Sequence, residues 1–419
     1  MRITFLVANY APSLGGAQMH VQHVAEGLAR QGHDVHVVTT DALRSPASAD
    51  AGRIPIGTET LGGVVVHRAP VARRLHGALR TSRRVGRRLG VWRPGRNSLL
   101  EAGPFGVRLA ATALSVGRSS DVVVGVGVPL ATLPAARFVT RTSAAAFVAT
   151  PLLHLDHPPR RRWVVRTMRS ADACTVSTRV ERDWLVQHGV RADRIMILPP
   201  MCEPDRFPEL DPSSARASLG IPEAPTVGYV GRMAAHKGID SLIGAMRAVW
   251  KVRPECRLLL AGASTGWSPD EALAALRADE RARVEVRREA SSTELAMRLA
   301  ACDVVAFPSR SESFGMVTIE AWCARRPVVV ADIPAVRDLV RAGVDADVVP
   351  VDDRAALSSA LVALLDDPER RARQGAAGRA RAVSEFSRQR IVDGWQELLS
   401  AVVERGQDRR TVRPFAVVR

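Results

Sequence analysis

Short apolar runs alternate with amphipathic segments along most of the chain. Residues 3–8 form a short run that is apolar except for Thr4, which is typical of a parallel strand buried on both faces. Residues 17–30 then repeat apolar positions every three or four residues, as a helix with one buried face does. The next apolar run, 35–39, begins shortly after Gly32. This order of strand, helix and strand predicts a βαβ unit.

The same alternation continues through the rest of the 419 residues. Further strand-like runs lie at 64–68, 121–128, 145–150, 173–177, 195–198, 226–230, 257–261, 284–286, 303–307, 328–331 and 347–349. Helical segments separate most of them, and three closing helices are predicted at 354–365, 369–383 and 386–403. A chain of this length can bury two separate cores. We therefore predict an α/β protein with two doubly wound domains.

The segment after the run 303–307 carries the strongest chemical signal. Gly315 ends a loop rich in Ser and Pro and is followed by nine residues without Gly or Pro, which predicts a helix. The free N–H groups and positive dipole end of that helix form an anion site, most often for phosphate. Glu312 and Glu320 flank this site and can accept hydrogen bonds from hydroxyls. The pattern indicates a sugar nucleotide; the alternative is a glutamate that only complements the dipole, with Glu312 solvated in the loop.

A second loop, directly after the run 226–230, carries two cations. Arg232 and Lys237 stand five positions apart between Gly231 and Gly238, so both can reach one diphosphate. Almost all the positive charge of this chain is arginine, and the only other lysine is Lys251. Arginine and lysine are not interchangeable, so a lysine kept at this position favours a specific role over coincidence.

These two segments resemble the Glu-x7-Glu region and the Arg-Lys loop of retaining glycosyltransferases of the GT-B fold, family 4. The resemblance covers most of the chain. It implies two Rossmann-like doubly wound domains that face each other across a cleft. The implied bounds are 1–205 for the acceptor-side domain, 206–385 for the nucleotide-sugar domain, 386–404 for a helix that crosses back to the first domain, and 405–419 for a tail.

The resemblance also implies a role for each site residue. Glu312 would contact the donor sugar, Glu320 the ribose hydroxyls, and Arg232 and Lys237 the departing diphosphate. His154, which follows the run 145–150, would reach the sugar near its reacting carbon, with His157 as its competitor. The implied catalytic residues are His154, Glu312, Arg232 and Lys237. The implied donor-binding residues are Gly15, Gly16, Arg232, Lys237, Ser313, Phe314, Gly315, Met316, Val317 and Glu320.

Some segments depart from the family pattern. Gly15-Gly16 is not a G-x-G-x-x-G fingerprint, which weakens a dehydrogenase interpretation and fits the family's Gly-Gly loop or a plain tight turn. Residues 200–207 lack the usual Asn-Gly, and 262–266 lack the usual Gly-x-Gly-Pro. Residues 287–289 are Arg-Arg-Glu where relatives often have glycine, so the identity of the nucleobase is obscured.

The implied reaction is retaining transfer of a sugar from a nucleoside diphosphate sugar, in which a donor phosphate oxygen takes the acceptor's proton. No Asp-x-Asp stands beside the nucleotide site, so we expect no metal, and no cofactor beyond the nucleotide-sugar co-substrate. Two alternatives remain. One is a GT-B epimerase or phosphorylase, and the other is a non-catalytic partner that binds a nucleotide or a membrane.

The net charge of +16 implies an anionic partner. Residues 68–96 hold ten arginines and no acid, interspersed with apolar residues. A basic amphipathic helix on an anionic membrane and a solvated arginine-rich face both fit this pattern. No nucleic-acid motif accompanies the charge, so nucleic acid is not expected. A lipid-linked acceptor fits the membrane interpretation, and a small metabolite or natural-product scaffold fits nearly as well.

Cysteine usage and the first residues bear on location. Five cysteines form no C-x-x-C pair, which fits a reducing cytosol better than a disulfide framework. The strand-like start predicts no signal peptide. The longest uncharged apolar stretch, 122–136, is broken by Gly and Pro and is too short to span a membrane. We expect a cytoplasmic protein, with the inner face of the membrane as a second location.

Overall fold

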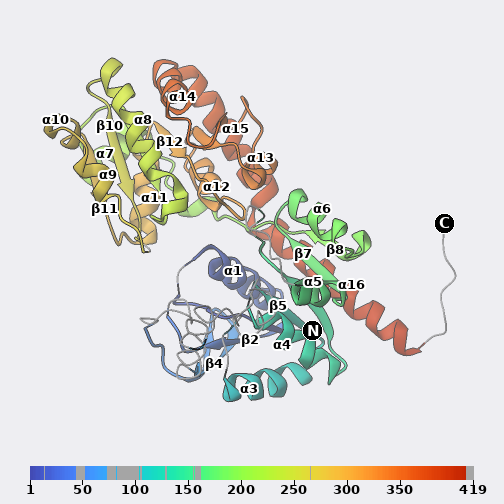
Figure 1. Ribbon diagram of the computed structural model, residues 1–419. Coiled ribbons are helices and arrows are strands. Elements are labelled where there is room, and N and C mark those ends of the chain that lie inside the picture. Colours follow the sequence, from blue (N-terminus) through green and yellow to red (C-terminus); the bar gives the residue numbers. More distant parts are fainter. Residues whose placement is uncertain are drawn as a thin grey trace, which may run out of the picture. The chain divides into compact units, whose positions relative to one another are not determined.

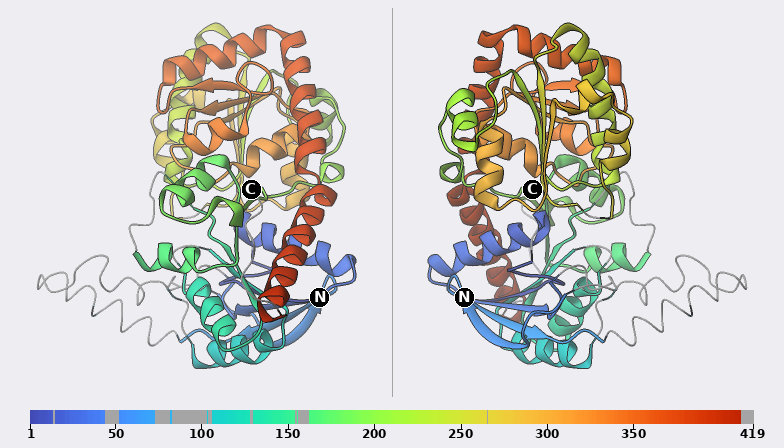
Figure 2. Two further views of the ribbon diagram at one scale, coloured as in Figure 1. Left: turned by 90° about the vertical axis from the view of Figure 1, so that its right-hand side faces the viewer. Right: turned by 90° about the vertical axis from the view of Figure 1, so that its left-hand side faces the viewer.

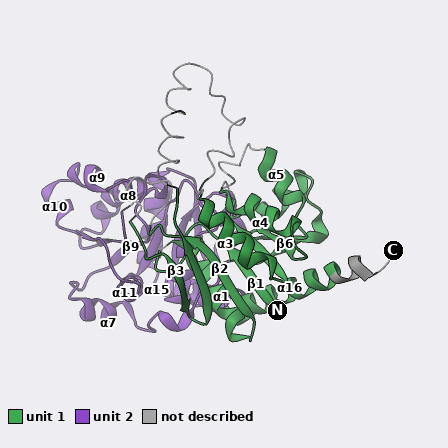
Figure 3. Ribbon diagram, turned by 90° about the horizontal axis from the view of Figure 1, so that it is seen from below, with its two compact units in different colours: residues 1–199, 388–419 green, residues 200–387 purple. Residues whose placement is uncertain are grey.

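The computed structural model divides the chain into two compact units (Figures 1 and 3). It describes residues 1–13, 15–43, 52–72, 82, 103, 106–127, 130–153, 155, 162–264 and 266–411, with side chains up to 406. Unit 1 comprises residues 1–199 and 388–419, and unit 2 comprises 200–387. The sequence placed the two boundaries at 205/206 and 385/386, a few residues from these.

Unit 1 is built on an eight-stranded sheet with the order β3-β4-β2-β1-β5-β6-β7-β8. The strands are β1 (Arg2–Leu6), β2 (Asp34–Thr40), β3 (Gly57–Leu61), β4 (Val64–Ala69), β5 (Val122–Val126), β6 (Ala146–Thr150), β7 (Ala173–Val176) and β8 (Ile195–Ile197). All neighbours are parallel except the β3–β4 pair. β3 is an addition to the prediction: its Gly-Thr-Glu-Thr-Leu sequence is exposed and shows no apolar run.

The helices of unit 1 cover this sheet. They are α1 (Gly16–Arg30), α3 (Val107–Arg118), α4 (Thr132–Arg141), α5 (Arg162–Arg169), α6 (Arg179–Gln187) and α16 (Arg388–Thr411), with a 3-10 turn at η1 (Ala192–Arg194). Strand β5 is entirely buried, which explains its uninterrupted apolar sequence.

The last helix returns to unit 1. Helix α16, dark red in Figure 2, packs against α1, where Gly27 leaves room for the side chain of Val392. Trp395 is buried, with its ring 6.0 Å from that of Phe5. The sequence predicts that this helix ends at 404, but it continues to Thr411. No proline interrupts the chain between Trp395 and Pro414, so the helix can extend this far.

Unit 2 contains a six-stranded, all-parallel sheet with the order β11-β10-β9-β12-β13-β14. Its strands are β9 (Thr226–Val230), β10 (Arg257–Ala261), β11 (Val284–Arg287), β12 (Val304–Phe307), β13 (Val328–Ala331) and β14 (Asp347–Val349). Its helices are α7 (Pro212–Leu219), α8 (Ile239–Val252), α9 (Asp270–Ala274), α10 (Ala278–Arg281), α11 (Ser292–Ala300), α12 (Met316–Cys323), α13 (Pro334–Leu339), α14 (Arg354–Asp366) and α15 (Pro368–Phe386), with 3-10 turns η2 (Pro204–Arg206) and η3 (Ala235–Lys237).

The strand orders confirm the predicted α/β class with two doubly wound sheets. Among the parallel strands of each sheet the order reverses direction once, between β1 and β5 in unit 1 and between β9 and β12 in unit 2. Open parallel sheets bind ligands at the carboxyl ends of the strands beside such a switch point. The fold therefore directs attention to the loops that follow these four strands. Among the described residues, no helix is long and apolar enough to cross a membrane.

Candidate functional site

Two loops meet at the switch point of unit 2. One follows β9 and includes residues 231–238, and the other follows β12 and includes 308–315. Strands β9 and β12 are parallel neighbours with Val227 opposite Val304, so both loops leave the same edge of the sheet. Gly238 has φ +66°, and a Cβ there would overlap the carbonyl oxygen of Pro308. Glycine is therefore required where the two loops touch.

The contact between the loops brings Lys237 and Glu312 together. The Lys237 ammonium donates to both carboxylate oxygens of Glu312, with Nζ 2.6 Å from Oε1 and 2.7 Å from Oε2. Ser309 adds a hydrogen bond from its hydroxyl to Oε1 at 2.9 Å. Only 11% and 10% of the two charged side chains are exposed. The sequence assigned these residues to the diphosphate and the sugar but gave no sign that they form an ion pair.

Arg232 lies on the same loop as Lys237 and is exposed. Among the described residues, none accepts a hydrogen bond from its guanidinium. Its backbone carbonyl is held by the Tyr229 hydroxyl at 2.8 Å, and the Tyr229 ring packs edge-on against Phe307. The backbone of Arg232 is thus fixed while its charge stays available to a ligand.

Helix α12 begins directly after Gly315, as the sequence predicts, and its first N–H groups have no side-chain cap. Gly315 is its N-cap residue, with φ 101° and ψ 46°, and no side chain caps the helix. Helices α6, α7 and α11 differ, because Thr178, Asp211 and Ser291 accept hydrogen bonds from their first turns. Phe314, which precedes the cap, is buried against Phe386. The first N–H groups of α12 therefore remain for an external acceptor.

Three more of the predicted donor-binding residues lie at this helix start. Ser313 precedes the buried Phe314, and Met316 and Val317 are the first two residues of α12. All three are half-buried. An anion bound to the amides here would lie beside their backbone.

Glu320 is the second predicted acid and lies on α12. It is half-buried, and among the described residues none donates to its carboxylate. Burial raises the pKa of Glu320 to about 7, although the positive charge of Arg206 acts in the opposite direction. Its carboxylate is thus poorly satisfied within the protein, which suits a group that accepts hydrogen bonds from a ligand.

Arg310, which sequence reasoning missed, ties the two loops together. Its guanidinium donates to the carboxylates of Asp240 and Asp352 and to the carbonyl of Ala235. The partners lie far from Arg310 in sequence, so no local pattern could have identified it. Among the described residues, no group of His, Cys, Asp and Glu could hold a metal ion.

The other predicted residues belong to unit 1. Gly15 and Gly16 open helix α1 directly beyond the loop that follows β1, at the switch point of that sheet. No side chain caps α1. His154 and its competitor His157 lie outside the described residues, as does most of the basic segment 68–96. The described Leu153 is held by Glu181, whose Oε1 accepts from its backbone N–H at 2.6 Å.

Models of two related families match most of the chain. The model described as "Glycosyl transferases group 1" matches residues 224–367, and the model described as "Glycosyl transferase 4-like domain" matches residues 15–201. The chain belongs to the group 1 glycosyl transferases. The family predicted from the sequence is therefore confirmed, and the two loops described above belong to the part that the group 1 model matches.

Curated relatives of this group 1 glycosyl transferase have several names. A D-inositol 3-phosphate glycosyltransferase of Xylanimonas cellulosilytica is 35% identical over 251 residues, which cover 57% of each chain. An alpha-D-kanosaminyltransferase of Streptomyces kanamyceticus is 31% identical and covers 54% of this chain and 59% of its own. The chain thus spans little more than half the length of these relatives. A glycogen synthase of Mycobacterium tuberculosis is 28% identical and covers 96% of this chain and 94% of its own.

Solved structures share the fold over almost the whole length. Sucrose-phosphate synthase from Thermosynechococcus elongatus has a TM-score of 0.74 at 20% identity, covering 96% of this chain and 99% of its own. Alr3699/HepE of Anabaena, solved with UDP and glucose, has a TM-score of 0.70 at 19% identity, covering 95% and 99%. This group 1 glycosyl transferase therefore has the predicted GT-B fold.

Proposed function

We propose that the protein is a retaining glycosyltransferase that moves a sugar from a nucleoside diphosphate sugar to an acceptor hydroxyl without a metal ion. The observation that carries this proposal is the gathering of complementary groups at one switch point. Two cations, an uncapped helix start and a poorly satisfied carboxylate lie on the two loops and the helix that follow β9 and β12. The cations and the helix start would bind a diphosphate, and carboxylates would accept hydrogen bonds from the hydroxyls of a sugar and a ribose.

The charges account for departure of the nucleotide. As the bond between the sugar C1 and the phosphate oxygen breaks, negative charge grows on the diphosphate. Lys237, Arg232 and the first N–H groups of α12 would stabilise that charge from fixed positions. Because these groups already supply positive charge, a metal ion is not needed to neutralise the leaving group. Glu320 would accept the ribose hydroxyls.

The sugar would lie beside Glu312, and the resemblance to the family assigns His154 to the same sugar. The acceptor oxygen forms the new bond to C1 on the face that the phosphate leaves, so the anomeric configuration is retained. The acceptor proton passes to a phosphate oxygen of the departing nucleoside diphosphate, which completes the proton balance. Glu312 and His154 then orient the sugar and are not nucleophiles.

Relatives guide the choice of donor and acceptor. The structures of Alr3699/HepE hold UDP, UDP-glucose, and UDP with glucose, so UDP is the first nucleotide to test. D-inositol 3-phosphate glycosyltransferases recur among the relatives, which favours an acceptor with several hydroxyls. A lipid-linked or membrane-proximal glycan precursor is the acceptor class that the basic segment 68–96 supports, with the protein in the cytoplasm at the inner face of the membrane.

Thermal unfolding with UDP, GDP, ADP and dTDP, each with and without its common sugars and without metal, tests the donor site. A ligand that binds only the folded protein stabilises it, by about 2.7 kcal/mol at a ligand concentration of one hundred times Kd. This stabilisation raises the melting temperature. We expect one base to stabilise the wild type and the exposed control Glu271→Ala, but not Glu320→Ala. No stabilisation by any nucleotide would overturn the proposal.

Transfer itself is then tested with that donor in the presence of EDTA. We expect product whose anomeric configuration, read from its NMR coupling constant, equals that of the donor. Inversion of configuration, or complete loss of turnover with EDTA, would contradict the retaining and metal-independent parts of the proposal. Turnover of the donor without acceptor would favour an epimerase, and dependence on inorganic phosphate would favour a phosphorylase. Sedimentation with anionic liposomes, compared with neutral ones, tests the membrane part.

A further inference from the structure

Arg310 makes an unusual number of contacts for an arginine beside a proposed ligand site. Its Nε donates to Asp352, with Oδ1 and Oδ2 at 2.9 and 2.8 Å. Its two terminal nitrogens donate to Asp240, at 2.9 Å from Nη1 to Oδ1 and 2.7 Å from Nη2 to Oδ2. Nη1 also reaches the carbonyl of Ala235 at 2.8 Å, and Nη2 the hydroxyl of Ser241 at 3.0 Å.

These contacts use the whole guanidinium. An arginine has five N–H donors in a planar fork, and each nitrogen of Arg310 already faces acceptors of the protein. The carboxylates of Asp240 and Asp352 hold the pKa of Arg310 well above its usual range, so the charge is permanent. Arg310 therefore has no donor left for a diphosphate. A role as a third phosphate-binding cation, beside Arg232 and Lys237, does not fit this geometry.

What Arg310 does hold is the backbone on both sides of the Lys237–Glu312 pair. Its own N–H donates to the carbonyl of His236 at 2.8 Å, and its guanidinium takes the carbonyl of Ala235. These are the two residues directly before Lys237 in the 3-10 turn η3. Arg310 itself stands two residues before Glu312. It thus fixes the backbone next to each member of the pair.

We call this set of Arg310 contacts the clamp, and it also involves a third loop. Asp352 follows β14, the edge strand of the sheet, and has φ +59° in the left-handed region, which few residues other than glycine adopt. Ser241 at the start of α8 donates to Asp352 at 2.6 Å and so joins the same network. The loops after β9, β12 and β14 are therefore connected through one side chain.

We propose that Arg310 is a positioning residue that holds Lys237 and Glu312 where the diphosphate and the sugar of the donor meet them. This inference rests on the proposed function, because it assigns Arg310 to the same site. It separates two contributions to donor affinity. Glu320 would bind the nucleoside from α12, to which Arg310 makes no hydrogen bond in the described structure. The diphosphate would instead depend on the loop 231–238, which Arg310 holds.

Binding of UDP, UMP and uridine to Arg310→Met tests this separation by calorimetry. We expect uridine affinity to stay within about twofold of wild type, while the ratio of UDP to uridine affinity falls at least tenfold and kcat falls about a hundredfold, since a shift of 1 Å can have that effect. Arg310→Lys, which keeps the charge but not the fork, should lose nearly as much. Arg253→Met is the control, because Arg253 forms a similar exposed pair with Asp366 away from these loops.

A double-mutant cycle tests whether Arg310 acts through Lys237. If it does, Arg310→Met in a Lys237→Ala background should change the ratio of UDP to uridine affinity by less than twofold. Equal losses for uridine and UDP, or full additivity with Lys237→Ala, would overturn the inference and leave Arg310 a general stabiliser of the fold.

Hydrogen exchange supplies a test that needs no nucleotide. Arg310→Met should speed amide exchange in residues 231–238 and 308–315 and leave the amino ends of β9 and β12 unchanged. Uniform exchange, or no change in the two loops, would also overturn the inference. If the wild type binds none of the three ligands, the proposed function fails in its UDP form, whereas the exchange result still decides whether Arg310 clamps the loops.

Discussion

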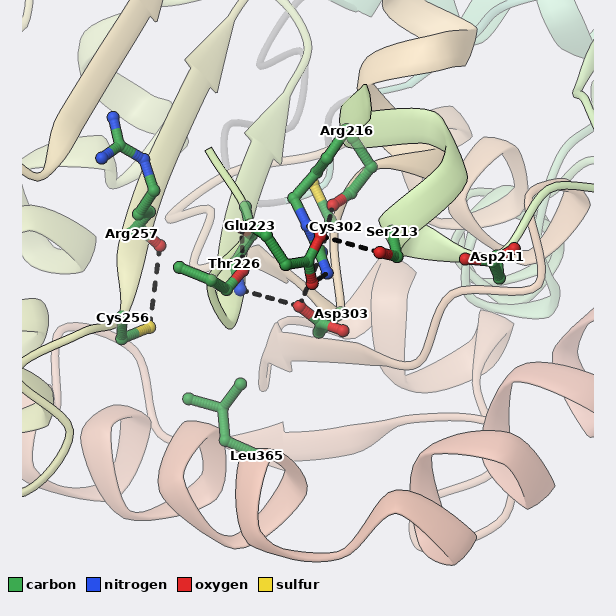
Figure 4. A network of polar contacts seen from close by, with 12 residues as sticks. Asp211, Ser213, Arg216, Glu223, Thr226, Cys256, Arg257, Cys302, Asp303 and Leu365 are labelled. Carbon is green, nitrogen blue, oxygen red and sulfur yellow. Dashed lines mark hydrogen bonds and ion pairs between the residues drawn. The ribbon is translucent and has the colours of Figure 1, made fainter. Parts of the chain in front are cut away.

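Unit 2 carries charged groups at both ends of the same two strands, β9 and β12, and the two groups are built differently. At the amino ends, Arg216 of α7 donates to Asp303 at 3.0 Å and to Glu223 at 2.5 and 3.2 Å (Figure 4). Asp303 also accepts from the backbone N–H of Thr226, the first residue of β9, at 2.8 Å. Each charge in this group has a partner within the protein.

The group at the carboxyl ends is incomplete by comparison. Lys237 and Glu312 pair with each other, but among the described residues the guanidinium of Arg232 and the carboxylate of Glu320 have no hydrogen-bond partner. The start of α12 has no side-chain cap either. In a parallel α/β sheet, helices begin where strands end, so free N–H groups and positive dipole ends collect at this edge only. We infer that the amino-end group stabilises the fold and the carboxyl-end group binds a ligand.

The largest expected difference between the two groups is catalytic. Lys237→Ala should lower kcat by about 10²–10³-fold, because it removes a fixed charge from the leaving diphosphate. Lys251→Ala is the matched control, since Lys251 is the only other lysine and is exposed on α8. Steady-state kinetics with the donor identified by thermal unfolding measure the effect, on protein whose circular dichroism is unchanged. Activity within threefold of wild type would remove Lys237 from the mechanism.

The amino-end group should affect stability alone. Arg216→Met leaves Asp303, whose side chain is 15% exposed, without its cation, and should lower the free energy of unfolding by about 2–3 kcal/mol. Urea unfolding measures this loss, and Arg253→Met at a more exposed pair should show no measurable change. UDP affinity should equal that of wild type. A loss of UDP affinity at unchanged stability would contradict the distinction between the two groups.

Glu320 should make donor binding depend on pH. Its pKa in the folded protein is raised by burial to about 7, and ribose hydroxyls bind best to the ionised form. UDP affinity should therefore fall about tenfold from pH 8 to pH 6 as the carboxylate takes up a proton. Calorimetry of wild type and Glu320→Gln separates this effect from titration of the nucleotide. The variant has no ionisable group at position 320, so its UDP affinity should change with pH only through the nucleotide.

The same shift predicts the pH dependence of stability. An acid whose folded pKa is raised destabilises the protein once it ionises, so the loss develops from the unfolded value near 4.5 and is complete above about 7. Glu320→Gln without nucleotide should therefore raise the melting temperature more at pH 8 than at pH 5. Equal effects at both pH values would show that the carboxylate is not desolvated in solution.

The smallest expected effect concerns the Lys237–Glu312 pair. Glu312→Gln removes the negative charge that Lys237 faces and should tighten binding of free UDP roughly fivefold, by releasing the cation for the diphosphate. Transfer should slow at the same time, because the sugar loses a contact. Calorimetry with UDP and kinetics with the sugar nucleotide measure the two changes, with Glu271→Gln as control. If Glu312→Gln binds UDP more weakly than wild type, the phosphate site requires the intact ion pair between Lys237 and Glu312.

Much of the fold could be predicted because parallel strands buried on both faces have uninterrupted apolar sequences. The runs 226–230 and 303–307 match β9 and β12 almost residue for residue. Strand β3 was missed because it is polar, exposed and paired on one edge only. Helix α3 was missed as well; only Ala113 and Gly117 of its twelve residues are buried, so little of its surface contributes to the core.

The candidate site could be predicted where its chemistry lies within one short segment. The open helix start after Gly315 and the two cations of the loop 231–238 are local features of sequence. The ion pair of Lys237 with Glu312 and the clamp of Arg310 on Asp240 and Asp352 are not, because their partners are brought together only by the order of strands in the sheet.

The sequence by itself determined the class of fold, the family and the residue types available for a nucleotide sugar, because hydrophobic period, loop glycines and helix starts are local properties of a chain. The tertiary structure alone decided which of those charges are already satisfied and which remain for a ligand. Whether a charge has a partner within the protein depends on the distances between side chains. Parallel pairing of β9 with β12 places the loop at 231–238 beside the loop at 308–315, although about seventy residues separate them.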